Sequence, residues 1–281
     1  MKVKIVVDST ADMRPEVAAK VGIVPLSVQF GDKEYISGVN INPKQFYEML
    51  VESDILPTTS QPAPYLCEEA CETALSEGEQ VVCLTCSGKL SGTNQSANIA
   101  AAEFAGKVHV VDSQTIAIGL GILAEYAVAL AERGLTAEEI VLNLLGKREK
   151  IQVLALVDTL EYLKKGGRIS SAVALAGGLL NIKPIISVNG GEIRLLGKTR
   201  GSRQGNNLLV QEIQKAGGVD FSMPLMLGYT GLSDVLLQKY IQDSAALWED
   251  HVEELPVSIV GSVVGTHVGP GAVAVAFFAG A

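Results

Sequence analysis

The sequence is poor in aromatic residues and in basic residues. Phe, Trp and Tyr together make up 5% of the 281 residues, and 22 Lys and Arg stand against 31 Asp and Glu, which gives a formal net charge of −9. Contacts to phosphate groups need clustered Lys and Arg, and stacking of bases needs aromatic side chains. The composition therefore argues against a protein that binds nucleic acid.

Long apolar runs are also lacking, although 48% of the residues are hydrophobic. No stretch reaches the ~18 uninterrupted apolar residues that a membrane span needs. The first apolar run, residues 3–7, is followed at once by Asp8 and Asp12, which is unlike a signal peptide. We therefore expect no membrane span and a cytoplasmic location.

Cysteines are few, and all four lie between residues 67 and 86, as C-x3-C and C-x2-C. A zinc site is one interpretation of this spacing. Cys67 and Cys71 share one face of a predicted helix, but Cys83 and Cys86 belong to an apolar run that predicts a strand. Residues three apart on a strand point to opposite faces, so both cannot bind one ion. Buried reduced thiols are the favoured interpretation, and no metal site is expected.

The motifs of nucleotide-binding proteins are missing as well. The sequence contains no G-x-x-x-x-G-K-[ST] pattern, and no G-x-G-x-x-G follows a predicted strand. These glycine patterns bring the backbone close to phosphate groups. No nucleotide cofactor is therefore predicted.

The arrangement of apolar patterns predicts an α/β fold. In the first half, β-rich runs alternate with helical patterns, which is typical of βαβ units and a largely parallel sheet. In the second half, residues 183–200 read as a hairpin about Asn189-Gly190-Gly191, which indicates a mixed sheet. The charged stretch at 148–152 marks the boundary. We predict two α/β domains, 1–150 and 151–281.

Local signals place several elements within these halves. Asn42 is the expected N-cap of a helix with Pro43 at its first position, and Thr136 with Glu139 forms an expected capping box. Residues 257–264 predict a strand, and residues 170–182 predict an apolar helix rich in small residues.

Residues 84–104 form the first segment that can carry chemistry. A predicted strand leads through a Ser/Gly loop into a helix, with Ser91 as the expected N-cap and Gly92 and Thr93 following. Free N–H groups and the positive end of the helix dipole make such a helix start suitable for an anion. The alternative is an ordinary capped helix without a ligand.

Three further segments have polar residues in predicted turns. P-T-T-S-Q-P, residues 57–62, is a turn bounded by prolines. G-T-H-V-G-P-G, residues 265–271, places His267 in a loop after a strand, where sites are common. In residues 158–170, a short helix ends at a Gly-Gly turn that precedes Arg168. Taken alone, each is consistent with a turn, a loop or a helix end.

A serine hydrolase is one alternative, because Ser91, Asp158 and His267 occur in the order Ser…Asp…His. A nucleophile elbow, however, needs G-x-S-x-G directly after a strand. Here the residues around Ser91 are K-L-S-G-T, and several loop residues separate them from the strand. The triad is therefore the less favoured interpretation.

Taken together, these segments carry a resemblance to a known family. They are D-S-T (8–10), P-T-T-S-Q-P (57–62), S-G-x-x-S-G-T (87–93), D-x-L-x-x-L-x-x-G-G-R-I-S (158–170), K-P-I (183–185) and G-T-H-V-G-P-G (265–271). In this order and spacing the sequence resembles the DegV family of bacterial fatty-acid-binding proteins over nearly the whole chain.

The resemblance implies one long-chain fatty acid in a tunnel between the two domains. The first domain would supply the loops that bind the carboxylate, and the second would cover the acyl chain. The residues that would bind the carboxylate are Thr59, Ser91, Gly92 and His267. Those that would contact the head group or a partner are Ser60, Thr93, Arg168 and Arg200.

The resemblance also implies a partner. Members of the family present the bound acid to a separate fatty acid kinase, which phosphorylates the carboxyl group. The protein itself would then have no catalytic residue, metal or cofactor, and at most a transient contact with a membrane. The alternatives are an acyl-ester hydrolase or transferase using Ser91 and His267, and a purely regulatory or interaction module.

Overall fold

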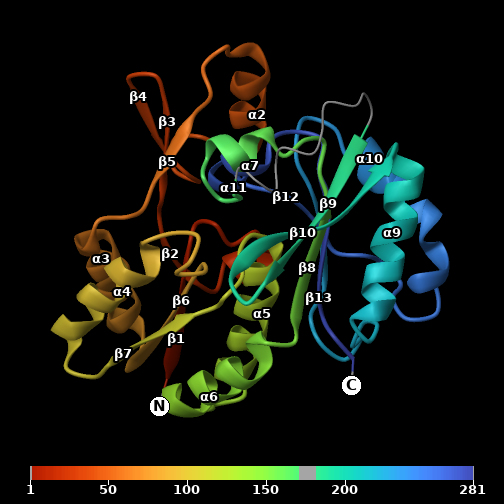
Figure 1. Cartoon of the computed structure of the whole chain (residues 1–281). Helices are drawn as coiled ribbons and strands as arrows, with labels where there is room; N and C mark the ends of the chain where they lie inside the picture. Colours follow the sequence, from red (N-terminus) through yellow and green to blue (C-terminus); the bar gives the residue numbers. More distant parts are fainter. Residues whose placement is uncertain (1, 171–181, 281) are drawn as a thin grey trace.

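The structure, a computed structural model, describes residues 2–170 and 182–280. It contains a four-stranded sheet of order β2-β1-β6-β7, a six-stranded sheet of order β10-β9-β8-β13-β11-β12 and a three-stranded sheet of order β4-β3-β5. Figure 1 shows the four-stranded and six-stranded sheets side by side, with the three-stranded sheet beyond one end of them. The α/β fold predicted from the sequence is confirmed.

The four-stranded sheet is parallel throughout, as predicted. Its strands are β1 (Val3–Asp8), β2 (Gly22–Val24), β6 (Gln80–Thr85) and β7 (Val108–Asp112). The helices of this half are α1 (Pro15–Ala18), α3 (Pro64–Glu77), α4 (Thr93–Ala101) with the 3₁₀ turn η1 (Ala102–Phe104), α5 (Ile118–Glu132) and α6 (Ala137–Arg148).

Alternation along the strands decides which helix covers which face of this sheet. In β6, Val81 and Cys83 pack beneath α3 and α4, whereas Val82 and Leu84 face α5 and α6. This is the period of two that a strand buried on both faces requires.

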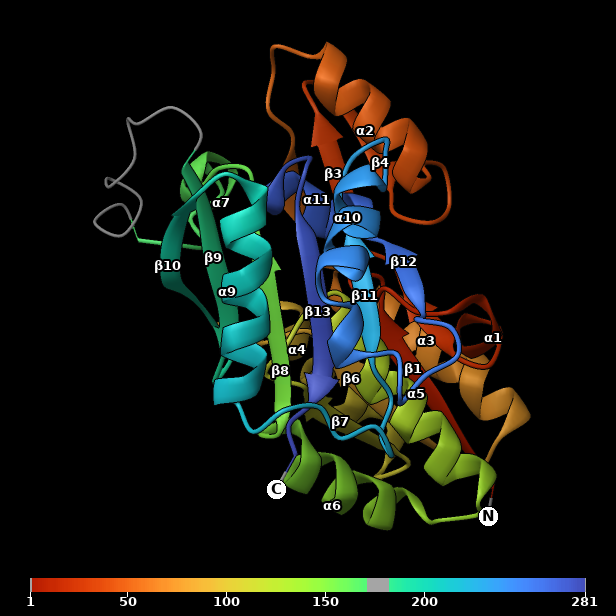
Figure 2. The same ribbon diagram turned by 90° about the vertical axis from the view of Figure 1, so that its right-hand side faces the viewer.

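The six-stranded sheet is mixed, also as predicted. Only the β11–β12 pair is parallel, and the other pairs are antiparallel. The strands are β8 (Ile151–Leu156), β9 (Ile182–Asn189), β10 (Glu192–Arg200), β11 (Met226–Tyr229), β12 (Val257–Ile259) and β13 (Val273–Phe278). Figure 2 shows α9 (Ser202–Lys215) and α10 (Val235–Asp243), which the 3₁₀ turn η2 (Ala245–Leu247) follows, on the outer face of this sheet.

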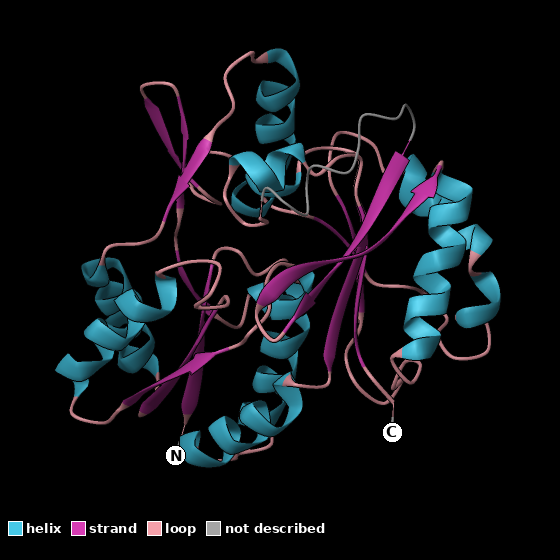
Figure 3. Ribbon diagram, in the orientation of Figure 1, coloured by secondary structure: helices cyan, strands magenta, loops and turns pink. Residues whose placement is uncertain are grey.

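Helix α5 joins the two sheets into one core. It contacts β1 and β6 on one side and β8, β11 and β13 on the other, and its buried side chains share a cluster with both sheets. Ten of its 15 residues are buried, so most of its circumference has to be apolar. Figure 3 shows this helix between the strands of the two sheets.

The three-stranded sheet as a unit, with β5 as its third strand, was not predicted. It consists of β3 (Ser27–Phe30), β4 (Lys33–Ile36) and β5 (Thr58–Ser60), and its core includes side chains from α2 (Pro43–Glu52) and α11 (Ser262–Val268). The segment 57–62, expected as a turn, therefore contains the strand β5. The pairing of β5 with β3 overrides the turn preference of its hydroxyl residues.

Several local predictions are confirmed. Asn42 caps α2 with Pro43 at the first position, the capping box of Thr136 and Glu139 is present, and residues 189–192 connect the β9–β10 hairpin. The helix predicted over 170–182 lies almost wholly outside the described residues, and Ile182 begins β9.

The strand predicted over 257–264 is wrong in its second half. Strand β12 ends at Ile259, and α11 begins at Ser262, so His267 lies in the last turn of a helix and not in a loop. The valines suggest a strand, but packing against α2 decides the conformation. A Cβ atom on Gly265 would lie 2.6 Å from the hydroxyl of Tyr47, so glycine allows this close approach.

In the part of the chain that the structure describes, no helix has both the length and the apolar character needed to cross a membrane. The division into two domains at residue 150 stays a prediction.

Candidate ligand-binding site

A cavity of about 200 Å³ is lined by residues from both halves of the chain. Most of its wall is apolar and comes from α5, α11, the six-stranded sheet and the loops around them. These residues are Leu26, Leu90, Ile116, Ala117, Ile118, Val153, Ala155, Leu163, Ile186, Val188, Ile193, Val260, Val263, Val264, Val268, Ala272 and Ala274. The polar groups of the wall are Thr10, Thr59, Ser60, Gln61, Cys86, Ser91, Arg168, Tyr229, Thr230 and His267, with the backbone of Gly92 and Gly228.

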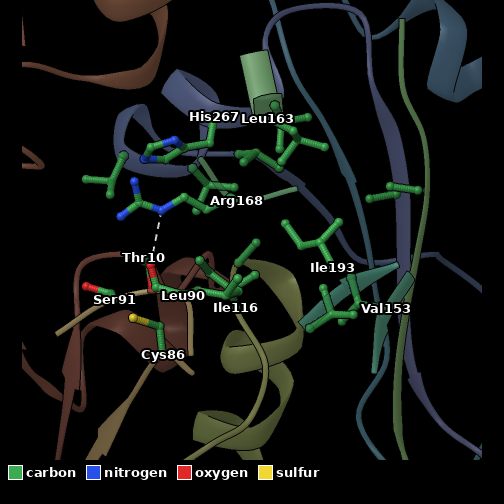
Figure 4. A pocket seen from close by; sticks show the side chains of 18 of the residues that line it. Thr10, Cys86, Leu90, Ser91, Ile116, Val153, Leu163, Arg168, Ile193 and His267 are labelled. Carbon is green, nitrogen blue, oxygen red and sulfur yellow. Dashed lines mark hydrogen bonds between the residues drawn. The ribbon is translucent and has the colours of Figure 1, made fainter. Parts of the chain in front are cut away.

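Figure 4 shows how these side chains lie. His267, Arg168, Ser91 and Thr10 gather on one side of the cavity, and Ile193 and Val153 lie on the opposite side. The cavity therefore has a polar end and an apolar body.

Thr59 and His267 form the contact at the polar end. The Oγ1 atom of Thr59 lies 2.8 Å from Nε2 of His267. Strand β5 holds Thr59 opposite Val28, and α11 carries His267. A Cβ atom on Gly166 would collide with the imidazole, so glycine at this position leaves space for the ring.

The second polar group comes from the start of α4. Gly92, and not Ser91, is the N-cap, because Ser91 still belongs to the preceding turn, in which its N–H donates to the carbonyl oxygen of Ser87. The Oγ atom of Ser91 lies 2.8 Å from Oγ1 of Thr93 and accepts from the N–H of Thr93 at 3.3 Å. Thr93 is buried outside the cavity lining and orients Ser91.

Gly92 and Gln61 are in close contact beside this helix start. A Cβ atom on Gly92 would overlap the side-chain amide of Gln61, whose Nε2 donates to Oγ of Ser96 at 3.2 Å. Glycine therefore lets the segment after β5 approach the N-terminus of α4, where N–H groups favour an anion.

The two arginines of the predicted site are in different places. Arg168 lines the cavity, and its guanidinium donates to the carbonyl oxygen of Leu90 at 3.1 Å (Figure 4). It also donates to the carbonyl oxygen of Gly166 at 2.6 Å. Arg200 is exposed at the end of β10 and does not line the cavity. A role for Arg200 in contacting the head group is therefore not supported by its position.

The charge state of His267 follows from its surroundings. Burial, and then the positive charge of Arg168, lower its pKa from 6.5 to about 4. The imidazole is therefore neutral near pH 7, when one ring nitrogen donates and the other accepts. Its Nδ1 atom is buried and has no hydrogen-bond partner among the described residues.

The structure does not assemble a Ser-His-Asp triad. Asp158 forms an ion pair with Lys183, His267 contacts Thr59, and Ser91 contacts Thr93. Among the described residues no hydrogen bond joins Ser91 or Asp158 to His267, whereas a triad needs both.

The D-S-T motif holds part of the cavity wall in place through Asp8, a role that the sequence did not indicate. Asp8 is buried and accepts from the backbone and the hydroxyl of Thr10, at 2.9 and 2.6 Å, and from the N–H of Cys86 at 2.6 Å. Thr10 and Cys86 line the cavity. Burial raises the pKa of Asp8, and these hydrogen bonds oppose the shift.

All four cysteines are free and buried, as expected. Cys67, Cys71 and Cys83 share the cluster beneath α3 and α4, and Cys86 lies on the other face of the sheet. Within residues 2–170 and 182–280, no group of three or more His, Cys, Asp or Glu side chains could hold a metal ion.

The fold and the cavity define an α/β protein with an internal, largely apolar cavity that is polar at one end. The chain belongs to the DegV family: the family model described as "uncharacterised protein, DegV family" matches residues 2–280. A DegV domain-containing protein of Deinococcus radiodurans is 37% identical over 282 residues, which cover 98% of each chain. The resemblance found in the sequence is therefore confirmed.

Solved structures agree over the whole length. The structure described as fatty acid binding of a DegV family protein from Thermus thermophilus is 33% identical, covers 99% of this chain and 100% of its own, and has a TM-score of 0.88. A stearic acid-binding protein from Eubacterium ventriosum is 27% identical, with coverage of 99% and 98% and a TM-score of 0.87.

Proposed function

We propose that this protein binds one long-chain fatty acid, with the carboxylate at the polar end of the cavity and the acyl chain in its apolar body. The observation that carries the proposal is the enclosed apolar wall that ends at Thr59, Ser91, Arg168 and His267. An amphipathic anion matches this distribution of apolar and polar groups. The fatty acids bound by the relatives support the same class of ligand.

The head group meets donors that are already in place. Hydroxyl groups of Thr59 and Ser91 and the backbone at Gly92 can donate to a carboxylate, and a hydrogen bond to a charged group contributes about 1.5–3 kcal/mol. Arg168 brings a positive charge to the same end. Ser60 also lines this end, and Thr93 acts through Ser91.

The tail supplies the larger part of the driving force. Each buried methylene contributes about 0.8 kcal/mol before the costs of ordering the ligand. A cavity of about 150 Å³ holds a molecule of the size of benzene. The cavity of about 200 Å³ therefore has to widen into a tunnel when a long acyl chain enters.

We further propose that the protein catalyses no reaction itself and presents the bound acid to a separate fatty acid kinase. In this arrangement the loops of residues 1–150 bind the carboxylate together with Arg168 and His267, and residues 151–281 supply most of the wall that covers the acyl chain. The support is the family resemblance, the missing nucleotide motifs and the triad that is not assembled.

Mass spectrometry of lipid released from protein purified without added ligand tests the binding proposal. We expect one long-chain fatty acid per chain. Absence of a stoichiometric acyl species, together with no binding on titration, would contradict it. Reproducible hydrolysis of acyl esters that is lost in His267→Ala would favour the hydrolase instead.

A further inference from the structure

Asp12, just after β1, is a buried carboxyl group that the proposed binding site does not use. Its side chain is 7% exposed. One carboxyl oxygen, Oδ1, accepts from the N–H of Gly261 at 2.8 Å. The other oxygen, Oδ2, is buried without a hydrogen-bond partner among the described residues.

Asp12 connects two segments of the cavity wall. Its N–H donates to the carbonyl oxygen of Ala117 at 3.3 Å, and its carboxyl group holds Gly261, which follows Val260. Ala117, at the start of α5, and Val260, before α11, both line the cavity. The first segment belongs to the first half of the chain and the second to the last 25 residues.

The backbone is tightly fitted around this connection. Ala117 has φ 56° and ψ −133°, a conformation that L-residues adopt only where their surroundings enforce it. A Cβ atom on Gly121, in the next turn of α5, would collide with the carbonyl oxygen of Asp12. The segment that contains Asp12 is therefore held against α5 as well as against α11.

Within residues 2–170 and 182–280, no cation forms an ion pair with the carboxyl group of Asp12. Arg14, two residues further on, pairs with Glu16 and with Glu125 of α5. The titratable group that faces Asp12 from α2 is Tyr47, whose hydroxyl donates to the carbonyl oxygen of Val260 at 2.9 Å.

Two tyrosines complete this surrounding. Burial is the main cause that raises the pKa of Tyr47, and the negative charge of Asp12 is the second. Tyr229 of β11 raises it slightly further. The phenol of Tyr47 is therefore neutral near pH 7 and adds no charge to oppose that of Asp12. Burial raises the pKa of Asp12 to about 7, although the hydrogen bond from the N–H of Gly261 acts to lower it.

We propose that Asp12 is a positioning residue that joins the two wall segments and takes up a proton when an apolar ligand fills the cavity. The inference rests on the fatty-acid binding proposed above. Asp12 does not itself line the cavity, but its carboxyl group holds Gly261, next to the lining residue Val260. Replacing water in the cavity by an acyl chain makes the surroundings of the carboxylate less polar, which disfavours its charged form.

Linkage gives the sign of the effect. A group that gains proton affinity on binding makes the ligand bind more tightly as the pH falls through its titration range. Because Asp12 is about half protonated near pH 7 when the cavity is empty, we expect uptake of up to about half a proton per stearate at that pH. His267 and the carboxyl group of stearate itself can also take up a proton, so their contributions have to be separated from that of Asp12.

The experiment is isothermal titration of delipidated protein with stearate at pH 7, in buffers that differ in ionisation enthalpy. The His267→Gln variant should keep the uptake that comes from Asp12. The Asp12→Asn variant should lose it, because its amide oxygen can still accept from Gly261 but the side chain no longer titrates. At pH 8 this variant should bind stearate more tightly than the wild type, with the two converging near pH 6.

A second measurement keeps the test valid if Asp12→Asn fails to fold. The carboxyl carbon of Asp12 in the wild type, followed by NMR across pH 5–9, should titrate at higher pH with stearate than without it. An unchanged titration, or equal proton uptake in the wild type and Asp12→Asn, overturns the inference while fatty-acid binding stands. Failure of the wild type to bind stearate at all would contradict the proposed function instead.

Discussion

Thr59 and His267 are 208 residues apart in the sequence, and their side chains meet at 2.8 Å at the polar end of the cavity. The contact depends on the three-stranded sheet, which holds β5 beside α11. His267 is thereby placed where it is half-buried, neutral and next to Arg168. Its protonation should therefore report both folding and ligand binding.

We expect the stability of the empty protein to fall at mildly acidic pH because of His267. Its pKa is about 4 in the folded protein and about 6.5 when unfolded, so the unfolded state binds more protons between these values. The stabilising contribution of the neutral ring is complete above pH 6.5 and is lost as the pH falls toward 4. The free energy of unfolding should fall by at most on the order of 3 kcal/mol from this cause.

Urea unfolding of delipidated wild type and His267→Gln at pH 7 and pH 4.5 checks this expectation. The variant should lose less stability than the wild type, because other groups titrate equally in both. Bound fatty acid should reduce the difference, since a carboxylate beside the ring raises the pKa of His267. An equal loss in both proteins would mean that His267 is not held neutral in the folded protein.

The parts of this site that the sequence predicted are those set by local signals. Asn42 and Thr136 cap their helices because capping needs only neighbouring residues. The hairpin at Gly190 and Gly191 follows from two glycines with positive φ between strands. Thr59, Ser91 and His267, which the family motifs singled out, line one cavity.

The features that the sequence did not predict depend on contacts between distant segments. The strand β5 forms because β3 offers a pairing edge, and α11 forms where valines favour a strand because α2 and the three-stranded sheet pack against it. Likewise, nothing in the residues near Asp12 indicates that its carboxyl group meets Gly261. A pattern read along the chain does not contain these pairings.

Gly92→Ala should weaken fatty-acid retention while leaving the fold intact. The added methyl group displaces the amide of Gln61, which is the end of a flexible side chain, and breaks its hydrogen bond to Ser96. The backbone of Gly92, at φ −73°, accepts alanine without strain. We expect a loss of about 1 kcal/mol in the free energy of unfolding and a lower lipid content by mass spectrometry.

The matched control is Gly146→Ala in α6. Nothing lies within 4 Å of the added methyl group there, and the residue is exposed. This substitution should raise stability by up to about 1 kcal/mol, because alanine favours a helix over glycine. Unchanged lipid content in Gly92→Ala would mean that the contact between Gly92 and Gln61 does not contribute to ligand binding.

Ser91→Asp should weaken binding more than Ser91→Ala does. The alanine variant loses one hydrogen bond to the head group, worth about 1.5–3 kcal/mol, whereas the aspartate variant also places a like charge beside the carboxylate. Titration with stearate at low and high ionic strength measures both effects. Equal affinity of the two folded variants would place the head group away from Ser91.

The last prediction separates the two arginines. Arg168 lines the cavity and donates to the carbonyl oxygens of Leu90 and Gly166, so Arg168→Glu should reduce lipid content as well as phosphorylation of the bound acid. Arg200 is exposed and outside the cavity, so Arg200→Glu should leave lipid content unchanged. If a fatty acid kinase docks near β10, it should phosphorylate the acid bound to Arg200→Glu about fivefold more slowly than the acid bound to the wild type. This factor is the equivalent of ~1 kcal/mol for one exposed charge pair.

The assay combines purified kinase, ATP and stearate-loaded protein, with mass spectrometry of the lipid before the reaction. Lys239→Glu, exposed on α10 at the outer face of the six-stranded sheet (Figure 2), changes the net charge equally and is the control. If Arg200→Glu and Lys239→Glu slow phosphorylation alike, the effect comes from overall charge. Selective slowing in Arg200→Glu, with full lipid content, would locate the kinase contact at the end of β10.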